Sequence, residues 1–219
     1  RRQRPDVYKR QNSFHGRTIT TLAATGQDVF HHDFTPLTEG FVYAEPNDLA
    51  DLEQLIKANK CAAVMMEVVQ GEGGVMPLDE AYVKGAAKLC EQYDLLLICD
   101  EVQVGNGRSG KLYGYMHYGV QPDIVSTAKG LAGGLPLGAT LLGEKVQDVL
   151  SAGTHGSTFG GNPVCCAGAI NVLSRLDEKM LEGVEERSAY IKQELAGAKG
   201  VLGVSGLGLM LGIQTEKNA

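Results

Sequence analysis

The chain has 219 residues, of which 43% are hydrophobic and 21% charged, a composition that predicts a globular protein of mixed α/β class with a substantial buried core. Its net charge of −6 argues against nucleic acid as a partner, and no apolar run approaches the ~20 residues that span a membrane. The five cysteines show no C-x-x-C spacing. We therefore expect reduced thiols, no metal site and a cytoplasmic location.

The first eleven residues differ in kind from the rest. Residues 1–11 hold five of the 20 basic residues and a single acid. Such a basic run can be an arm that binds nucleic acid, but we interpret it as an artefactual leader outside the fold. The organised chain is expected to begin near Asn12.

From there onward, strand and helix patterns alternate. Asn47 is the predicted cap of a first helix, Asp79 caps a second that ends near Tyr93, and Pro163 opens a long helix that ends near Leu176. The predicted strands are residues 61–69, 95–99, 123–126 and 137–142, followed by two short strands within 201–214. Repeated strand–helix units indicate an α/β fold: a mostly parallel sheet with helices on both faces and a ligand beyond the carboxyl ends of its strands.

Two residues at the ends of predicted strands suggest a catalytic site. Asp100 follows the apolar run Leu95–Cys99, and Lys129 stands further on among small residues and glycines. A lysine in such surroundings can be desolvated, which favours the neutral amine that attacks a carbonyl, and a carboxylate at a strand end can hold a cation. Together they are parts of a pyridoxal phosphate (PLP) site. Taken singly, each residue type is more often a solvated loop lysine or a turn aspartate.

The glycine-rich segment between these residues matches two nucleotide-binding patterns. Gly105–Gly110 fits G-x-G-x-x-G, and with Lys111 it fits most of G-x-x-x-x-G-K-[ST], directly after an apolar strand. Leu112, however, stands where a magnesium-binding Ser or Thr is needed, and Asp123 comes too early for the ribose-binding acid of a dinucleotide fold. A P-loop-like ATPase is kept only as a distant alternative.

Four ordered motifs carry a resemblance that is more specific than any one of them. They are Asn12–Thr18 (NSFHGRT), Asp100–Gly110 (DEVQVGNGRSG), Ser126–Gly130 (STAKG) and Gly156–Pro163 (GSTFGGNP). In this order and spacing they resemble the class III (ω-amino acid) aminotransferases, PLP-dependent enzymes of fold type I. The likeness runs from Asn12 to about Ile213 and covers about half of a usual family member.

The resemblance implies a division of the chain. Residues 12–162 would form an incomplete PLP-binding large domain of fold type I, and residues 163–199 would be helices that lead toward a small domain. Residues 200–219 would be the truncated start of that C-terminal α/β domain.

The resemblance also assigns residues to the cofactor. Asp100 would keep the pyridine nitrogen protonated, and Lys129 would bond covalently to PLP and then act as the catalytic base. Residues i and i+2 of a strand point the same way, so Val102 would share the face of Asp100 and pack on one side of the ring, with Phe14 on the other. Gln103 matches the residue that hydrogen-bonds the phenolic oxygen.

Further assignments concern the substrate and a partner subunit. Ser157 and Thr158 match residues that reach the cofactor phosphate of a neighbouring subunit, which implies a homodimer with a shared active site. Arg17 matches the arginine that binds the α-carboxylate of the substrate. Glu72 matches a switch glutamate that pairs with a later arginine and releases it to accept 2-oxoglutarate.

Within the family, the chain is most similar to members that act on N-acetylornithine. The implied reaction moves the δ-amino group of N-acetylornithine to 2-oxoglutarate in arginine biosynthesis; ornithine or another ω-amino acid is the alternative donor. The phosphate-cradling segment of the family is missing upstream, Ser205 stands where the family often has Arg, and Val68 where it usually has Pro. We therefore expect these 219 residues alone to be inactive or nearly so.

Overall fold

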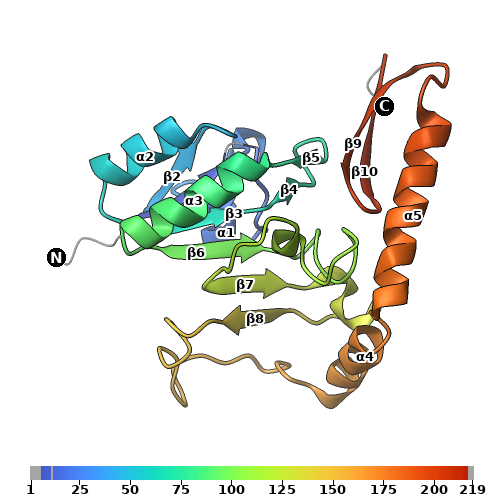
Figure 1. The fold of residues 1–219 in the computed structure, drawn as a ribbon. Coiled ribbons are helices and arrows are strands. Elements are labelled where there is room, and N and C mark those ends of the chain that lie inside the picture. The colour runs from blue at the N-terminus through green and yellow to red at the C-terminus, as the bar shows by residue number, and fades with distance from the viewer. Residues whose placement is uncertain (1–5, 11, 217–219) are drawn as a thin grey trace.

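One six-stranded sheet forms the centre of the protein. The structure, a computed structural model, describes residues 6–10 and 12–216. In spatial order the strands are β2 (Phe41–Ala44), β1 (Asp6–Arg10), β3 (Cys61–Met66), β6 (Leu96–Asp100), β7 (Ile124–Thr127) and β8 (Ala139–Leu142). Neighbouring strands are parallel, except that β8 runs antiparallel to β7 (Figure 1). The mostly parallel α/β sheet expected from the sequence is confirmed.

The strand β1 lies within the segment that the sequence analysis places outside the fold. Its residues pair in parallel with β2 on one side and β3 on the other. The structure corrects the expectation of a leader for residues 6–10; residues 1–5 and 11 lie outside the described part of the chain. Ladder hydrogen bonds are made by the backbone, so the basic composition of this segment does not keep it out of the sheet.

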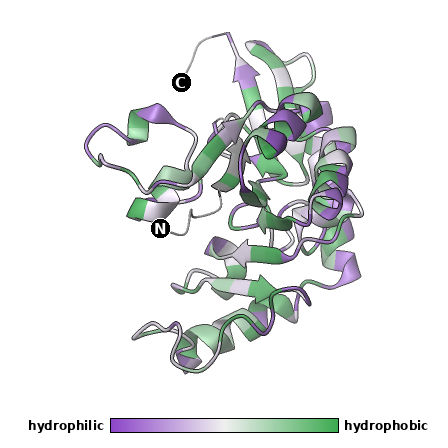
Figure 2. Cartoon of the chain, turned by 90° about the vertical axis from the view of Figure 1, so that its left-hand side faces the viewer, coloured by the Kyte–Doolittle hydropathy of each residue, from purple (hydrophilic) through white to green (hydrophobic). Residues whose placement is uncertain are grey.

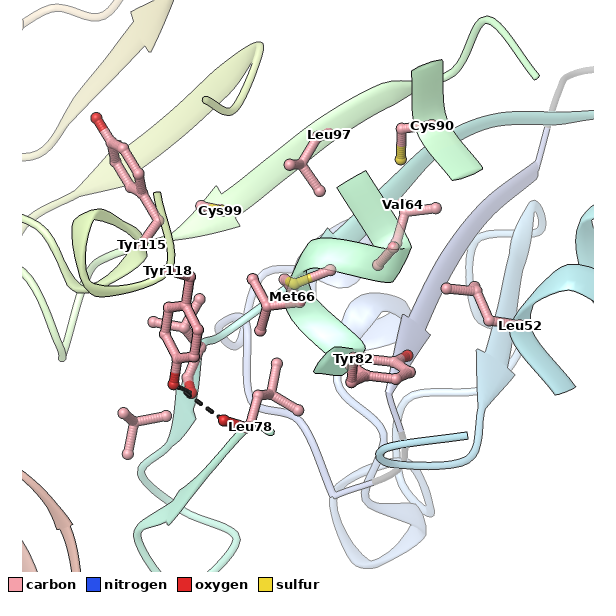
Figure 3. Close-up of a cluster of buried hydrophobic side chains, with 14 of the residues drawn as sticks. Leu52, Val64, Met66, Leu78, Tyr82, Cys90, Leu97, Cys99, Tyr115 and Tyr118 are labelled. Carbon is pink, nitrogen blue, oxygen red and sulfur yellow. Dashed lines mark hydrogen bonds between the residues drawn. The ribbon is translucent and has the colours of Figure 1, made fainter. Parts of the chain in front are cut away.

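Two helices cover one face of the sheet. α2 (Leu49–Ala58) and α3 (Glu80–Gln92) lie in front of the sheet in Figure 1, and Leu52, Val83 and Ala86 on them are completely buried. The sheet supplies the facing side of this core, shown in Figure 3, with Val64, Met66, Leu97 and Cys99. Burying one Leu or Val side chain contributes roughly 1.5–3 kcal/mol, so this layer holds the two helices on the strands.

The start of α2 differs by one residue from the prediction. Asp48, and not Asn47, is the cap: its side chain accepts hydrogen bonds from the backbone N–H groups of Ala50 and Asp51. Asn47 adopts a left-handed backbone with φ 59°. Its side-chain oxygen accepts a hydrogen bond of 3.1 Å from the N–H of Asp79. Asn47 therefore ties the beginning of α3 to the segment that precedes α2.

A short helix, α1 (Ile19–Ala24), covers the opposite face. Successive residues of a strand point to opposite sides of the sheet. Val42 and Ala44 of β2 pack in the core beneath α2 and α3, whereas the hydroxyl of Tyr43 between them donates a 2.8 Å hydrogen bond to the carbonyl of Ala23 in α1. The expected helices on both faces are thereby confirmed.

After β8 the chain leaves the sheet. The predicted helix at Pro163 forms, with Asn162 as its cap, but it ends at Leu173, and a second helix follows. The remaining elements are α4 (Pro163–Leu173), α5 (Glu178–Leu195), the hairpins β4 (Val69–Gln70) with β5 (Met76–Pro77) and β9 (Val201–Leu207) with β10 (Met210–Thr215), and the 3₁₀ helices η1 (Asp28–Phe30), η2 (Gly114–His117) and η3 (Lys129–Ala132).

Apolar side chains are exposed along the stretch that contains β8 and α4. They are Leu135, Leu141, Val149, Leu150, Phe159, Val164, Ile170 and Leu173. Much of α4, at the bottom of the view in Figure 2, is coloured as hydrophobic. No helix within the described ranges is long and apolar enough to cross a membrane.

Candidate functional site

The carboxyl ends of β6 and β7 meet at one edge of the sheet. Asp100, the last residue of β6, lies opposite Ser126 of the parallel strand β7. Because β7 ends at Thr127, Lys129 follows at the same edge, where it begins η3. Ligands of open α/β sheets bind at this edge, so the two residues singled out from the sequence are brought to one place.

Lys129 and Gln103 contact each other directly. The Nζ atom of Lys129 donates a 2.8 Å hydrogen bond to Oε1 of Gln103. The amide of Gln103 rests on Gly71, where an added Cβ would lie only 2.5 Å from it. The lysine side chain is exposed to solvent. Its amine is therefore held in a defined direction and remains accessible to a ligand.

The carboxylate of Asp100 is buried and oriented by two contacts. Only 6% of the residue is exposed. Its Oδ2 lies 2.7 Å from Nδ1 of His15, and its Oδ1 accepts a 3.0 Å hydrogen bond from the N–H of Val102. The His15 side chain is completely buried, and its Nε2 has no hydrogen-bond partner in the structure. His15 is thus a site residue that sequence reasoning missed, although it lies inside the NSFHGRT motif.

Val102 occupies a different local structure from the one predicted. The strand β6 ends at Asp100, and the chain turns from there on. The alternation of side chains along a strand therefore does not extend to Val102, which corrects that part of the reasoning. Val102 is placed beside Asp100 by the hydrogen bond from its own N–H to the carboxylate, as in an Asx turn.

A second buried acid holds the segment that carries Phe14. Glu67 is 5% exposed, and its Oε1 accepts a 2.9 Å hydrogen bond from the N–H of Phe14. Burial raises the pKa of Glu67, while the nearby His15 and the Phe14 N–H act in the opposite direction. Glu67 thereby fixes the Asn12–Thr18 motif against the end of β3.

The rings of Phe14 and Phe30 carry the guanidinium of Arg17. The two rings meet edge to face, with centroids 5.8 Å apart and planes inclined by 80°. The Cζ atom of Arg17 lies 4.5 Å from the Phe30 centroid and 5.5 Å from that of Phe14. Such cation–π contacts stabilise by about 0.5–1 kcal/mol when they are exposed, and Arg17 is exposed. The predicted ring-stacking residue and the predicted carboxylate-binding residue are therefore direct neighbours.

The other predicted residues lie further from Lys129. Glu72 is exposed in the turn between β4 and β5, next to the Gly71 that contacts Gln103. Ser157 and Thr158 are exposed in the segment between β8 and α4. Within the described part of the chain, no hydrogen bond joins either of them to Lys129 or Gln103.

The glycine-rich segment does not form a P-loop. Residues 105–110 turn back and lead into the 3₁₀ helix η2, whereas a P-loop opens an α-helix whose N-terminus binds phosphate. The segment is fastened by Glu101, which is fully buried and accepts hydrogen bonds of 2.7 and 2.9 Å from the N–H groups of Gly114 and Tyr115. Burial raises the pKa of Glu101 to about 7, against these two donors. The ATPase alternative is therefore abandoned.

The donor set at this edge fits the ring of PLP. An exposed amine is held for attack on an aldehyde, a buried carboxylate suits a protonated ring nitrogen, and an amide suits a phenolic oxygen. A phenylalanine ring adjoins them through the Glu67 contact. These are four different chemical demands, and one small group of residues meets them.

Known proteins share this sequence and this fold. The sequence profile described as "Aminotransferase class-III" matches residues 1–219. The chain is 50% identical over 207 residues to acetylornithine aminotransferase of Haemophilus ducreyi, covering 94% of the chain and 53% of that relative. It is 49% identical over 187 residues to succinylornithine transaminase of Yersinia pseudotuberculosis, covering 85% of the chain and 45% of that relative.

Solved structures agree. Ornithine aminotransferase of Toxoplasma gondii superposes with a TM-score of 0.90 at 36% identity, over 97% of this chain and 52% of that one. N-acetylornithine aminotransferase of Stenotrophomonas maltophilia does so with a TM-score of 0.79 at 34% identity, over 97% of this chain and 51% of that one. The chain spans about half the length of the curated relatives it matches. It belongs to the class-III aminotransferases, a family of PLP-dependent enzymes.

Proposed function

We propose that the enzyme containing these residues transfers the δ-amino group of N-acetylornithine to 2-oxoglutarate, as a step of arginine biosynthesis in the cytoplasm. The observation that carries the proposal is the hydrogen bond from Lys129 Nζ to Gln103 at the strand edge that also ends in the buried Asp100. The choice of donor is supported by the relatives of about half-identical sequence, which are named for acetylornithine and succinylornithine. Ornithine is the second candidate, because solved ornithine aminotransferases share the fold at lower identity.

The residues divide the chemistry among them. PLP, when bound, supplies an aldehyde and a ring that accepts electrons. Lys129 holds the cofactor covalently and, once released by the amino donor, moves a proton at the carbon that bears the amino group. Asp100, oriented by His15, pairs with the ring nitrogen. Gln103 binds the phenolic oxygen, and Phe14 flanks the ring.

Val102 is assigned to the second face of the ring, because its N–H places it against the Asp100 carboxylate. Arg17 is assigned to the substrate carboxylate: its guanidinium lies on rings beside the cofactor, and a fork of N–H donors binds a carboxylate in two places. Glu72, two residues before Gly74 in the β4–β5 turn, is assigned to the switch between the two substrates.

Ser157 and Thr158 are assigned to the cofactor phosphate of a second subunit. Their exposed hydroxyls lie in a segment flanked by exposed apolar residues such as Val149, Phe159 and Val164. An apolar patch of this kind favours a protein–protein contact. The proposed active unit is accordingly a homodimer whose two sites are each completed by the partner.

Covalent trapping tests the central assignment. The protein is incubated with PLP and reduced with borohydride, and the labelled peptide is identified by mass spectrometry. The label should reside on Lys129, disappear in Lys129→Ala and persist in Lys145→Ala, which removes an exposed lysine beyond β8. Label spread evenly over the surface lysines would refute the assignment.

Amine-donor profiling tests the substrate. A full-length form assayed with N-acetylornithine, N-succinylornithine and ornithine should prefer an acylated donor, and a preference for ornithine would move the assignment to the second candidate. The same assay on the 219 residues alone should give little turnover. A rate comparable to that of the longer protein would contradict that expectation.

A further inference from the structure

The glycine-rich segment contains a residue that reaches the lysine loop. Asn106 of Gly105–Gly110 directs its side chain across to the end of β7. Its Nδ2 donates hydrogen bonds of 2.9 Å to Oγ1 of Thr127 and 3.1 Å to the carbonyl oxygen of Ala128. These acceptors belong to the two residues that precede Lys129. The loop after β6 is therefore fastened to the turn after β7 at the point where the lysine begins.

The backbone at this point has an uncommon conformation. Lys129 has φ 42°, in the left-handed region that residues other than Gly, Asn and Asp rarely adopt. Ala128 before it has φ −162° and ψ −139°. Conformations of this kind persist where surrounding contacts hold them, and clusters of them mark functional sites.

The hydrogen bond to Ala128 acts directly on that conformation. The Ala128 carbonyl belongs to the peptide group that joins Ala128 to Lys129. Fixing the direction of this carbonyl fixes the plane from which the φ angle of Lys129 is measured. The direction in which the lysine side chain leaves the backbone, and hence its reach toward Gln103, follows from that angle.

The chemistry of the contact requires an amide at position 106. A backbone carbonyl only accepts hydrogen bonds, so Nδ2 and not Oδ1 must face Ala128; Oδ1 is buried without a partner. Asn106 itself has φ 56°, which asparagine tolerates better than most residues. A hydrocarbon would offer no donor, and a carboxylate would place an acceptor against an acceptor.

We propose that Asn106 is a positioning residue for Lys129. It holds the peptide between Ala128 and Lys129 so that Nζ stays on Gln103, where a cofactor aldehyde is attacked. The inference rests on the proposed function, because it gives Asn106 a part in the reaction of that lysine. Asn106 itself touches neither cofactor nor substrate in this scheme.

Two variants separate the side chain from the backbone. Asn106→Gly keeps the left-handed conformation and removes the amide. Asn106→Asp keeps the shape and the left-handed preference but replaces the donor by an acceptor. The matched control is Asn47→Gly, since Asn47 also has a left-handed backbone, φ 59°, and also bonds a distant backbone group, the N–H of Asp79.

The first measurement is the share of Lys129 that PLP labels on borohydride trapping at limiting PLP. Loss of the two hydrogen bonds should lower that share about tenfold in Asn106→Gly, a factor that corresponds to about 1.4 kcal/mol, and at least as much in Asn106→Asp. Asn47→Gly should leave it within about twofold. An equal loss in Asn106→Gly and Asn47→Gly, or no loss in either, would overturn the proposal.

The second measurement needs no PLP. The N–H of Leu131 donates a 2.9 Å hydrogen bond to the same Ala128 carbonyl, so amide hydrogen exchange in residues 128–133 should accelerate in Asn106→Gly and not in Asn47→Gly. Unchanged exchange would overturn the proposal. If the unaltered protein takes no label on Lys129, the proposed function fails, while exchange still decides whether Asn106 holds this turn.

Discussion

Glu101→Gln should change how the stability of the protein depends on pH. Burial raises the pKa of Glu101 to about 7 from its ordinary value of 4.5. A carboxyl whose pKa is higher in the folded state binds its proton more tightly there, so it stabilises the fold fully below pH 4.5 and loses that contribution as the pH rises through 7. The difference between the two pKa values, at about 1.36 kcal/mol per unit, amounts to about 3 kcal/mol.

Urea unfolding followed by circular dichroism measures this effect. The free energy of unfolding is determined at pH 5, 6, 7 and 8 for the unaltered protein, for Glu101→Gln and for Glu91→Gln, which removes an exposed acid from α3. The advantage of the unaltered protein over Glu101→Gln should shrink by about 2–3 kcal/mol between pH 5 and 8. A difference that stays constant within about 0.5 kcal/mol, or that grows with pH, would refute the reasoning.

Two further predictions concern single contacts. His15→Ala removes the imidazole that orients the Asp100 carboxylate at 2.7 Å and should weaken PLP binding at least about tenfold, since hydrogen bonds to charged groups contribute about 1.5–3 kcal/mol; equilibrium dialysis with PLP would show unchanged affinity if the contact is idle. Asp48→Ala removes the cap of α2 and should lower the free energy of unfolding by about 1 kcal/mol, and a urea midpoint equal to that of the unaltered protein would contradict the assignment of the cap.

The sheet and its helices could be predicted because their signals are local. The apolar run at Leu95–Cys99 is β6 shifted by one residue, and the helix expected at Asp79 is α3. Boundaries were harder, since Asn47 and Asp48 both suit a helix cap. Only the three-dimensional path decides between them: Asn47 bonds Asp79, 32 residues away.

The candidate site was predicted from residue types and spacing, and its supports were not. Asp100 and Lys129 follow apolar runs, which any reader of the sequence can see. His15 is paired with Asp100 across 85 residues, and Glu67 holds Phe14 across 53. Such partners have no local pattern, because a buried acid near the end of a strand reads in the sequence like any turn carboxylate.

The glycine-rich segment shows how one pattern serves different physics. An added Cβ at Gly107 would lie 2.9 Å from Leu176, and one at Gly110 would collide with Glu185 of α5. Both glycines also have positive φ, 83° and 91°. The glycines are therefore needed for the turn and for the close approach of the α5 region, where a P-loop would use them to approach phosphate. What distinguishes the two cases is the residue between the glycines: Asn106 faces the lysine turn, and the loop acts on Lys129 instead of on a nucleotide.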